Sequence, residues 1–150
     1  MAVFRENPYS RFNYLVNLGG GGDPGSVQAG FAEVTGLSLD VEVIEYRNGN
    51  ERSNAPRKLP GLSKVGDVTL KRGVIGATDL FDWLRTARDG NPERRNVTVQ
   101  LLSEDHQTVA MEWRLLNAWP RKYSGPELSA TTNDVAIEEL VLTCEGLDTA

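Results

Sequence analysis

The sequence predicts a mainly β protein, an antiparallel β-barrel or sandwich with one flanking α-helix. Most apolar residues recur with a period of two, which is typical of half-buried strands. Only one segment has a helical period, and glycine and proline residues separate the short strand-like runs. A chain of 150 residues is long enough for one core and too short for two, so we expect a single domain over residues 1–150.

Three strand-like segments lie in the first third of the chain. Residues 12–18 form the first, and a glycine-rich loop at 19–25 follows it. Residues 28–35 form the second. Residues 37–43 have the clearest alternation, with polar residues between the apolar positions Leu37, Leu39, Val41 and Val43. We therefore expect one face of this third strand to pack on the core and the other to be polar.

The segment 47–65 has no sustained period and carries two prolines and two glycines. Structureless loops longer than roughly 12–15 residues are uncommon in compact domains and are usually functional or ordered by a partner. We therefore expect a long extended loop at about 47–65. A regular strand pattern returns at 67–73.

Residues 78–88 form the one segment with a convincing helical pattern. Thr78 can cap the N-terminus, two aspartates occupy the first turn, and Gly90 follows the C-terminus. The expected buried stripe contains Leu80, Phe81, Leu84 and Ala87. Trp83 is expected at the margin of this stripe.

Three strands are expected after the helix. Residues 96–102 and 109–116 alternate and are expected to pair as a hairpin. Residues 119–126 contain two prolines and a glycine and are expected to form a rigid turn region. The last strand is expected at about 135–145.

Charge is distributed unevenly around a net charge of −5. Residues 47–72 carry seven basic and two acidic side chains, whereas residues 127–150 carry six acids and no base. This distribution fits either an ordinary solvated surface or two complementary surfaces that guide association between copies. A pI near 4.9 and the lack of aromatic residues inside the basic stretch argue against nucleic-acid recognition.

The sequence contains no group of residues suited to catalysis or metal binding. His106 is the only histidine and Cys144 the only cysteine, so neither a zinc site nor a disulfide within the chain is expected. The glycines at 19–22 lack the lysine of a phosphate-binding loop. Glu138 and Glu139 are adjacent in a strand and point to opposite faces. We therefore expect no enzyme activity and no cofactor.

No apolar run is long enough to cross a membrane, and a charge and a proline precede any apolar run at the N-terminus. We therefore expect no signal peptide and no membrane anchoring.

Short motifs along nearly the whole chain give it a family resemblance. They are Asn7-Pro8-Tyr9, Phe12-Asn13-Tyr14, Ala29-Gly30-Phe31, Val34-Thr35-Gly36-Leu37, Glu45-Tyr46-Arg47, Arg57-Lys58-Leu59-Pro60-Gly61-Leu62, Thr69-Leu70-Lys71-Arg72-Gly73, Asn117-Ala118-Trp119-Pro120, Lys122-Tyr123, Gly125-Pro126 and Val135-Ala136-Ile137-Glu138. In this order and spacing, they resemble the tail-tube (inner-tube) proteins of contractile phage tails and of extracellular contractile injection systems. These are distantly similar to the Hcp tube of type VI secretion.

The resemblance implies a structural subunit. Such proteins form hexameric rings that stack into a hollow tube, which is driven through a target envelope when a surrounding sheath contracts. The implied partners are further copies of the chain, a sheath protein, baseplate and spike proteins, and a luminal cargo protein, tape measure or DNA. The implied place of synthesis and assembly is the bacterial cytoplasm, and the implied destination is a phage tail or phage-tail-like particle.

The segment 47–65 is the candidate assembly interface within this hypothesis. Its leucines would bury apolar area, and its bases would meet acidic residues of a neighbour, among those after residue 126. The candidate interface residues are Arg47, Arg52, Arg57, Lys58, Leu59, Leu62 and Lys64. Two alternatives stay open: a baseplate-proximal tube initiator that forms a single ring, and a small ligand-binding β-barrel.

Overall fold

The computed structural model describes residues 4–19 and 30–150, so most of the expected glycine-rich loop and the start of the expected second strand lie outside the described residues. The described residues form nine strands and one helix: β1 (Tyr14–Asn17), β2 (Glu33–Thr35), β3 (Leu39–Tyr46), β4 (Arg57–Val65), β5 (Val68–Gly73), α1 (Asp79–Arg88), β6 (Arg95–Leu102), β7 (Val109–Ser124), β8 (Ile137–Thr143) and β9 (Gly146–Thr149). The predicted mainly β fold with antiparallel sheets and one flanking helix is confirmed.

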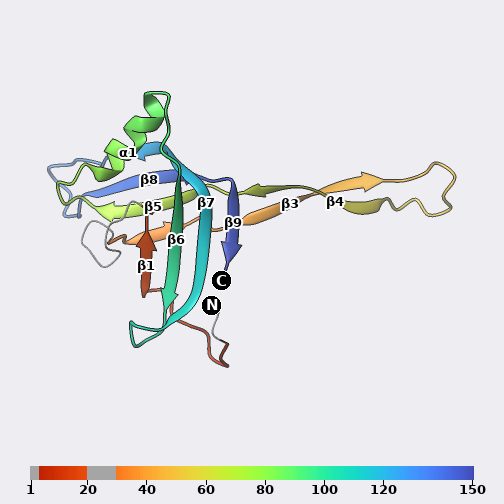
Figure 1. Ribbon diagram of the computed structural model, residues 1–150, viewed down its shortest axis with the longest axis horizontal. Helices are drawn as coiled ribbons and strands as arrows, with labels where there is room; N and C mark the ends of the chain where they lie inside the picture. Colours follow the sequence, from red (N-terminus) through yellow and green to blue (C-terminus); the bar gives the residue numbers. More distant parts are fainter. Residues whose placement is uncertain (1–3, 20–29) are drawn as a thin grey trace.

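The long strand β7 connects the two halves of the main sheet, whose strand order is β1-β6-β7-β8-β5-β2 with β9 also paired to β7. The first part of β7 pairs with β6 and β9, and its last part pairs with β8. The change of partner falls near Asn117, which has a positive φ of 52°. Because β7 bends there, β1 and β6 run across the direction of β5 and β8 (Figure 1).

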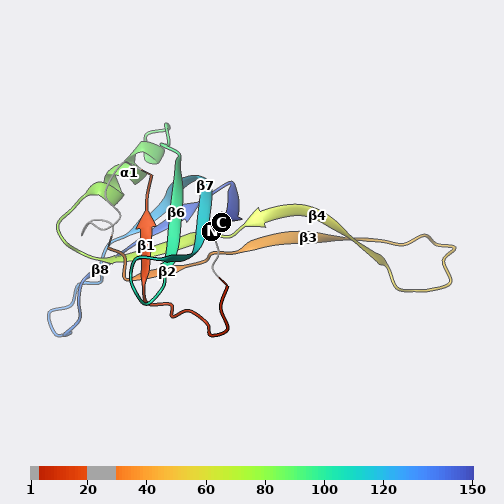
Figure 2. The same ribbon diagram turned by 60° about the horizontal axis from the view of Figure 1, so that its bottom comes forward.

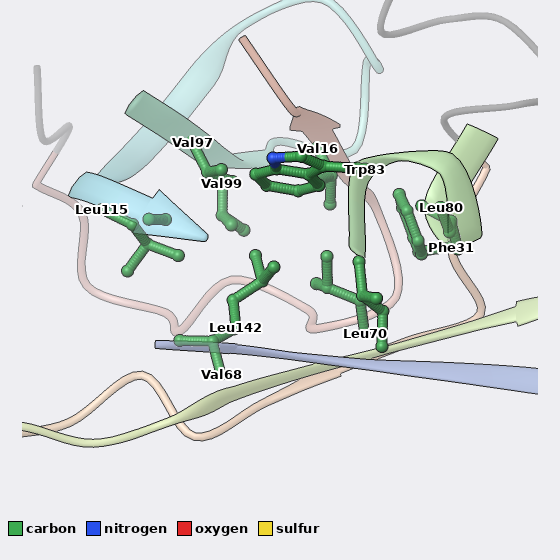
Figure 3. Packing of buried hydrophobic residues seen from close by; sticks show 12 residues of the cluster. Val16, Phe31, Val68, Leu70, Leu80, Trp83, Val97, Val99, Leu115 and Leu142 are labelled. Atoms are coloured by element: carbon green, nitrogen blue, oxygen red, sulfur yellow. The ribbon is translucent and has the colours of Figure 1, made fainter. Parts of the chain in front are cut away.

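The apolar core lies between these two halves of the sheet. Trp83 of α1 packs against Val97 and Val99 from one half and faces Leu70 and Leu142 from the other (Figure 3). Its indole Nε1 donates a hydrogen bond to the backbone oxygen of Glu93 at 2.7 Å. The buried polar atom of the largest core side chain is therefore satisfied.

The helix is confirmed, but its buried face differs from the expectation. Trp83, expected at the margin, is only 2% exposed, whereas Phe81, Leu84 and Ala87 are partly exposed. The helical period gives the spacing of the stripe but does not say which neighbours cover it. In the structure the core covers Trp83, while Phe81 packs edge-on against Tyr123. Thr78 makes no cap bond to the backbone, and its hydroxyl bonds Asp82 instead.

Several expected boundaries are corrected. Residues 57–65 of the expected loop form β4, and the expected turn at 119–126 continues β7 as far as Ser124. The expected last strand at about 135–145 corresponds to β8 alone, and β9 follows beyond its expected end. The first strand spans only Tyr14–Asn17, and the described part of the second is limited to Glu33–Thr35.

The hairpin between β6 and β7 and the strand β5 are confirmed. No helix within the two described ranges is long and apolar enough to cross a membrane.

Candidate assembly surface

Strands β3 and β4 form a separate two-stranded sheet that projects from the body as a long arm (Figures 1 and 2). They pair antiparallel from Leu39 opposite Val65 to Tyr46 opposite Arg57. The arm is defined here as residues 39–65. It lies against the body at its base, where β4 contacts β9. The arm contains all seven candidate interface residues.

Both faces of the arm expose apolar side chains. Pairing register places Leu39, Val41 and Val43 on one face and Ile44, Tyr46 and Leu59 on the other, and all six are about half exposed. The expectation that residues 37–43 pack one face on the core is therefore wrong for Leu39, Val41 and Val43, because the strand leaves the body. A two-stranded hairpin is marginally stable in water by itself. The arm thus has apolar surface on both faces that a partner can cover.

A bulge in the middle of the arm depends on glycine. The register shifts between Val41 and Val43, where Gly61 lies beside Glu42. A Cβ at Gly61 would lie 3.0 Å from the backbone oxygen of Glu42 and 3.2 Å from Cγ1 of Ile44. The close approach of the two strands at this point therefore favours a residue without a side chain.

Hydrogen bonds from Arg47 organise the tip of the arm. Its Nε donates to the backbone oxygen of Ser53 at 2.8 Å, and its Nη2 donates to that of Glu51 at 2.9 Å. Arg57 then pairs with the Glu51 carboxylate at 2.9 Å. These bonds close the connection between β3 and β4 without regular secondary structure.

The candidate interface residues divide between this internal role and open surface. Arg47 and Arg57 bond within the tip, and Lys64 pairs with Glu42 at 2.7 Å, so part of the predicted basic surface is neutralised locally. The remaining candidates are exposed and lie along β4 or at the tip: Arg52, Lys58, Leu59 and Leu62. Among them, Leu62 has 77% of its surface exposed.

A buried ion network holds the helix against the body. Arg72 of β5 is 1% exposed and lies opposite Glu138 of β8, with its Nε 2.8 Å from Oε1 of Glu138. The two terminal nitrogens of Arg72 bond both carboxylate oxygens of Asp79, at 3.1 and 2.8 Å. The second oxygen of Glu138 accepts a 2.6 Å hydrogen bond from the Tyr123 hydroxyl. One guanidinium thus connects two strands to the first turn of α1.

The network shifts the pKa values of two of its members. Burial alone would lower the pKa of Arg72, but hydrogen bonds to Asp79 and Glu138 outweigh it and raise the pKa above its ordinary value. The hydrogen bond to Glu138, followed by burial, raises the pKa of Tyr123 to about 12. Arg72 and Tyr123 therefore keep their protons at neutral pH and can donate these hydrogen bonds.

Sequence reasoning did not find this network. Arg72 was grouped with the basic stretch 47–72, although β5 turns its side chain inward. The available signal was alternation: Val68, Leu70 and Arg72 share one face of β5, as do Glu138, Leu140 and Leu142 on β8. A charge on the apolar face of each of two strands indicates a buried pair. The expectation that Glu138 and Glu139 point to opposite faces agrees with their burial.

The lone histidine and the lone cysteine belong to segments outside the arm. His106 lies in the turn between β6 and β7 and has a positive φ of 61°. Burial raises the pKa of the Cys144 thiol, and the charge of Asp67 adds to the effect. Among the residues that the structure describes, no three histidine, cysteine or acidic side chains form a group that could hold a metal ion.

One family model and several solved structures match most of the chain. The family model described as T4-like virus tail tube protein gp19 matches residues 10–148. A chain from the sheath-tube complex of PVC, an extracellular contractile injection system in its extended state, has 29% sequence identity and a TM-score of 0.84; the match covers 97% of this chain and 93% of that chain.

Two further structures extend the comparison. A chain of the anti-feeding prophage baseplate has 26% identity and a TM-score of 0.82, with 97% of each chain covered. Hcp1 from Flavobacterium johnsoniae has 16% identity and a TM-score of 0.56 over 93% of this chain and 95% of that one, a likeness in fold alone. No protein with curated annotation gave a significant match.

Proposed function

This chain belongs to the family of T4-like virus tail tube proteins, and from that premise we propose that it is the inner-tube subunit of a contractile injection system or contractile phage tail. The family resemblance drawn from the sequence is confirmed by a match over residues 10–148. Relatives at 26–29% identity come from a sheath-tube complex and from a baseplate, which supports self-assembly next to sheath and baseplate partners.

The observation that carries the proposal is the projecting arm with apolar residues on both faces. Such a ribbon gains stability when another copy covers it, and the interface of an obligate assembly buries on the order of 2,000 Å² or more. The arm makes this contact through the residues predicted from the sequence: Arg47, Arg52, Arg57, Lys58, Leu59, Leu62 and Lys64. A contact in which the arm of one copy covers a different surface of the next copy forms rings or open-ended tubes.

The mechanism is mechanical. Six copies form a ring, rings stack into a hollow tube, and contraction of a sheath drives the tube through a target envelope. The lumen conducts a cargo protein, a tape measure or DNA, and a spike precedes the tube. The protein contributes stiffness and a continuous bore, with no bond made or broken, so it is not an enzyme. Assembly takes place in the bacterial cytoplasm and ends in a phage tail or tail-like particle.

Electron microscopy of the purified chain tests the proposal. Wild-type protein at rising concentration is expected to form rings and then tubes with sixfold end views. A variant in which residues 47–56 are replaced by a short glycine-serine connection is expected to lose these assemblies and keep its circular dichroism spectrum. Protein that stops at one ring would favour the tube initiator. Protein that stays a single copy at high concentration would contradict the proposal and favour a ligand-binding barrel.

A further inference from the structure

An asparagine followed by glycine begins a turn at the tip of the arm. Asn48 is the only asparagine of the sequence with glycine directly after it. Its backbone oxygen accepts a hydrogen bond from the Glu51 backbone N–H at 3.2 Å, so residues 48–51 form a β-turn with Gly49 and Asn50 at its centre. Asn48 is half-buried, whereas the two central residues are exposed.

The backbone of this turn does not require glycine at position 49. Gly49 has no positive φ, and a Cβ built on it would meet no atom within 4 Å apart from its chain neighbours. Alanine therefore fits the turn. What glycine provides is an unshielded backbone nitrogen beside the Asn48 carboxamide. Among the hydrogen bonds of the described residues, none is donated by this nitrogen.

An unshielded backbone nitrogen after asparagine can attack the side-chain carboxamide within the same chain. The Gly49 nitrogen forms a bond to Cγ of Asn48, and the bond between Cγ and Nδ2 breaks. Nδ2 leaves as ammonia with the proton that the Gly49 nitrogen gives up. Water then opens the succinimide ring at either carbonyl carbon, which leaves aspartate or isoaspartate. The net reaction exchanges ammonia for water and needs no other reactant.

Two side chains bond the Asn48 carboxamide at the atoms that change charge in this reaction. The Tyr46 hydroxyl donates a hydrogen bond to Oδ1, where negative charge gathers when Cγ is attacked. A donor at this atom stabilises that charge, as the donors of an oxyanion hole do. Nδ2 donates to Oε1 of Glu51 at 3.3 Å. This carboxylate stabilises the positive charge on the nitrogen as it takes up a proton and leaves.

We propose that Asn48 is a site of spontaneous deamidation, with Tyr46 and Glu51 assisting the departure of its amide nitrogen. Asn50 and Asn54 lie in the same exposed connection between β3 and β4, but glutamate and alanine follow them. A side chain on the following residue hinders the attack, so these two asparagines serve as internal references. The reaction takes place within a single chain and does not depend on the proposed tube function.

The isoaspartate product changes the turn itself. The main chain then runs through Cβ and Cγ of residue 48. The former backbone carbonyl, whose oxygen accepts the turn hydrogen bond in Asn48, becomes a free carboxylate. This negative charge lies close to Glu51, which already bonds Arg47 and Arg57, and repulsion between the two carboxylates weakens the closure of the tip. We therefore expect the Glu51 backbone N–H to exchange with solvent faster in the isoaspartate product.

Storage of the purified chain in neutral buffer, followed by peptide mass spectrometry, tests the site. The protein is kept dilute, as a single copy. Asn48 is expected to lose its amide and to give both products, which chromatography separates, while Asn50 and Asn54 keep theirs over the same period. Gly49→Ala is the matched control, because alanine fits the turn but shields the nitrogen. We expect it to react at least about tenfold more slowly, a rise of ~1.4 kcal/mol in the barrier.

Tyr46→Phe distinguishes assistance by the hydroxyl from simple restraint of the carboxamide. If the hydroxyl stabilises charge on Oδ1, its removal slows the reaction. If it only held the carboxamide in place, its removal would free the group and speed the reaction. We expect the rate to fall at least about threefold, less than the ~10²–10³ of an enzyme's oxyanion donor, because Tyr46 is half exposed.

The possible outcomes give a clear decision. Retention of the amide at Asn48 while Asn50 or Asn54 reacts would overturn the site, as would a wild-type rate in Gly49→Ala. An unchanged or faster rate in Tyr46→Phe would overturn the assistance by the hydroxyl. Hydrogen exchange measured by mass spectrometry on the separated isoaspartate fraction completes the test. Unchanged exchange at Glu51 would overturn the predicted opening of the turn.

Discussion

Replacement of Arg72 by methionine tests whether the buried ion network stabilises the fold. Arg72 is 1% exposed, and its substitution leaves the Glu138 carboxylate, also almost fully buried, without its cation. Removing one partner of a buried pair costs roughly 3–5 kcal/mol of unfolding free energy. For a domain of this size the melting temperature should therefore fall by roughly 6–20 °C.

Urea unfolding followed by tryptophan fluorescence measures this loss at concentrations where the protein is a single copy. A matched control is Arg121→Met, because Arg121 pairs with Asp67 at a position where both side chains are substantially exposed. That pair should contribute less than about 1 kcal/mol. The comparison separates the effect of burial from the loss of an arginine in itself.

A triple variant refines the test. Combining R72M with E138L and Y123F removes the buried carboxylate and the hydroxyl that bonds it. Replacing a buried ion pair by apolar residues is often neutral or stabilising, so the triple variant should recover most of the lost free energy. A loss below about 1 kcal/mol for R72M would refute the reasoning. A triple variant no more stable than R72M would show that packing, and not the unpaired charge, carries the effect.

Three further predictions follow from other parts of the molecule. Trp83→Ala should cost about 3–5 kcal/mol of unfolding free energy, measured in urea, because Trp83 is the largest core side chain; a cost near zero would place the core elsewhere. Gly61→Val should crowd Glu42 and weaken assembly at least about tenfold while the urea midpoint of the body stays within error, and tubes at the wild-type concentration would argue against a role for the bulge. The Arg5 guanidinium lowers the pKa of Glu104 to about 2, so the stabilisation of residues 4–9 is complete above pH 4.5 and is lost as the pH falls toward 2. An NMR titration of the Glu104 carboxyl group should show this pKa and its return toward 4.5 in Arg5→Ala; an unchanged value in the variant would disprove the cause.

Local patterns were sufficient to predict the elements whose residues contact the core of their own chain. Each of these elements buries one side: the strand β5, the hairpin of β6 and β7, and the helix α1. Apolar residues therefore recur every second residue in the strands and with a helical period in α1. The order of short motifs also led to the tail-tube family, which the family match confirms. Only the segment 47–65 of the arm was predicted as a candidate interface, from its charge and its lack of period, and its role in assembly stays a prediction.

The remaining features depend on tertiary structure. The strand β4 shows no period because the arm exposes both of its faces, so neither face needs to be uniformly apolar. Pro120 lies inside β7 because it is beside a register shift, where a missing backbone N–H is tolerated.

Arg72 differs from the other bases of its stretch only in the direction of its side chain. That direction follows from the pairing of β5 with β8 and from the position of Asp79 at the start of α1. The sequence by itself thus determined the strands and the helix with one buried face, and the family. The tertiary structure decided which charge is buried and which strands leave the body, because both depend on contacts between segments far apart along the chain.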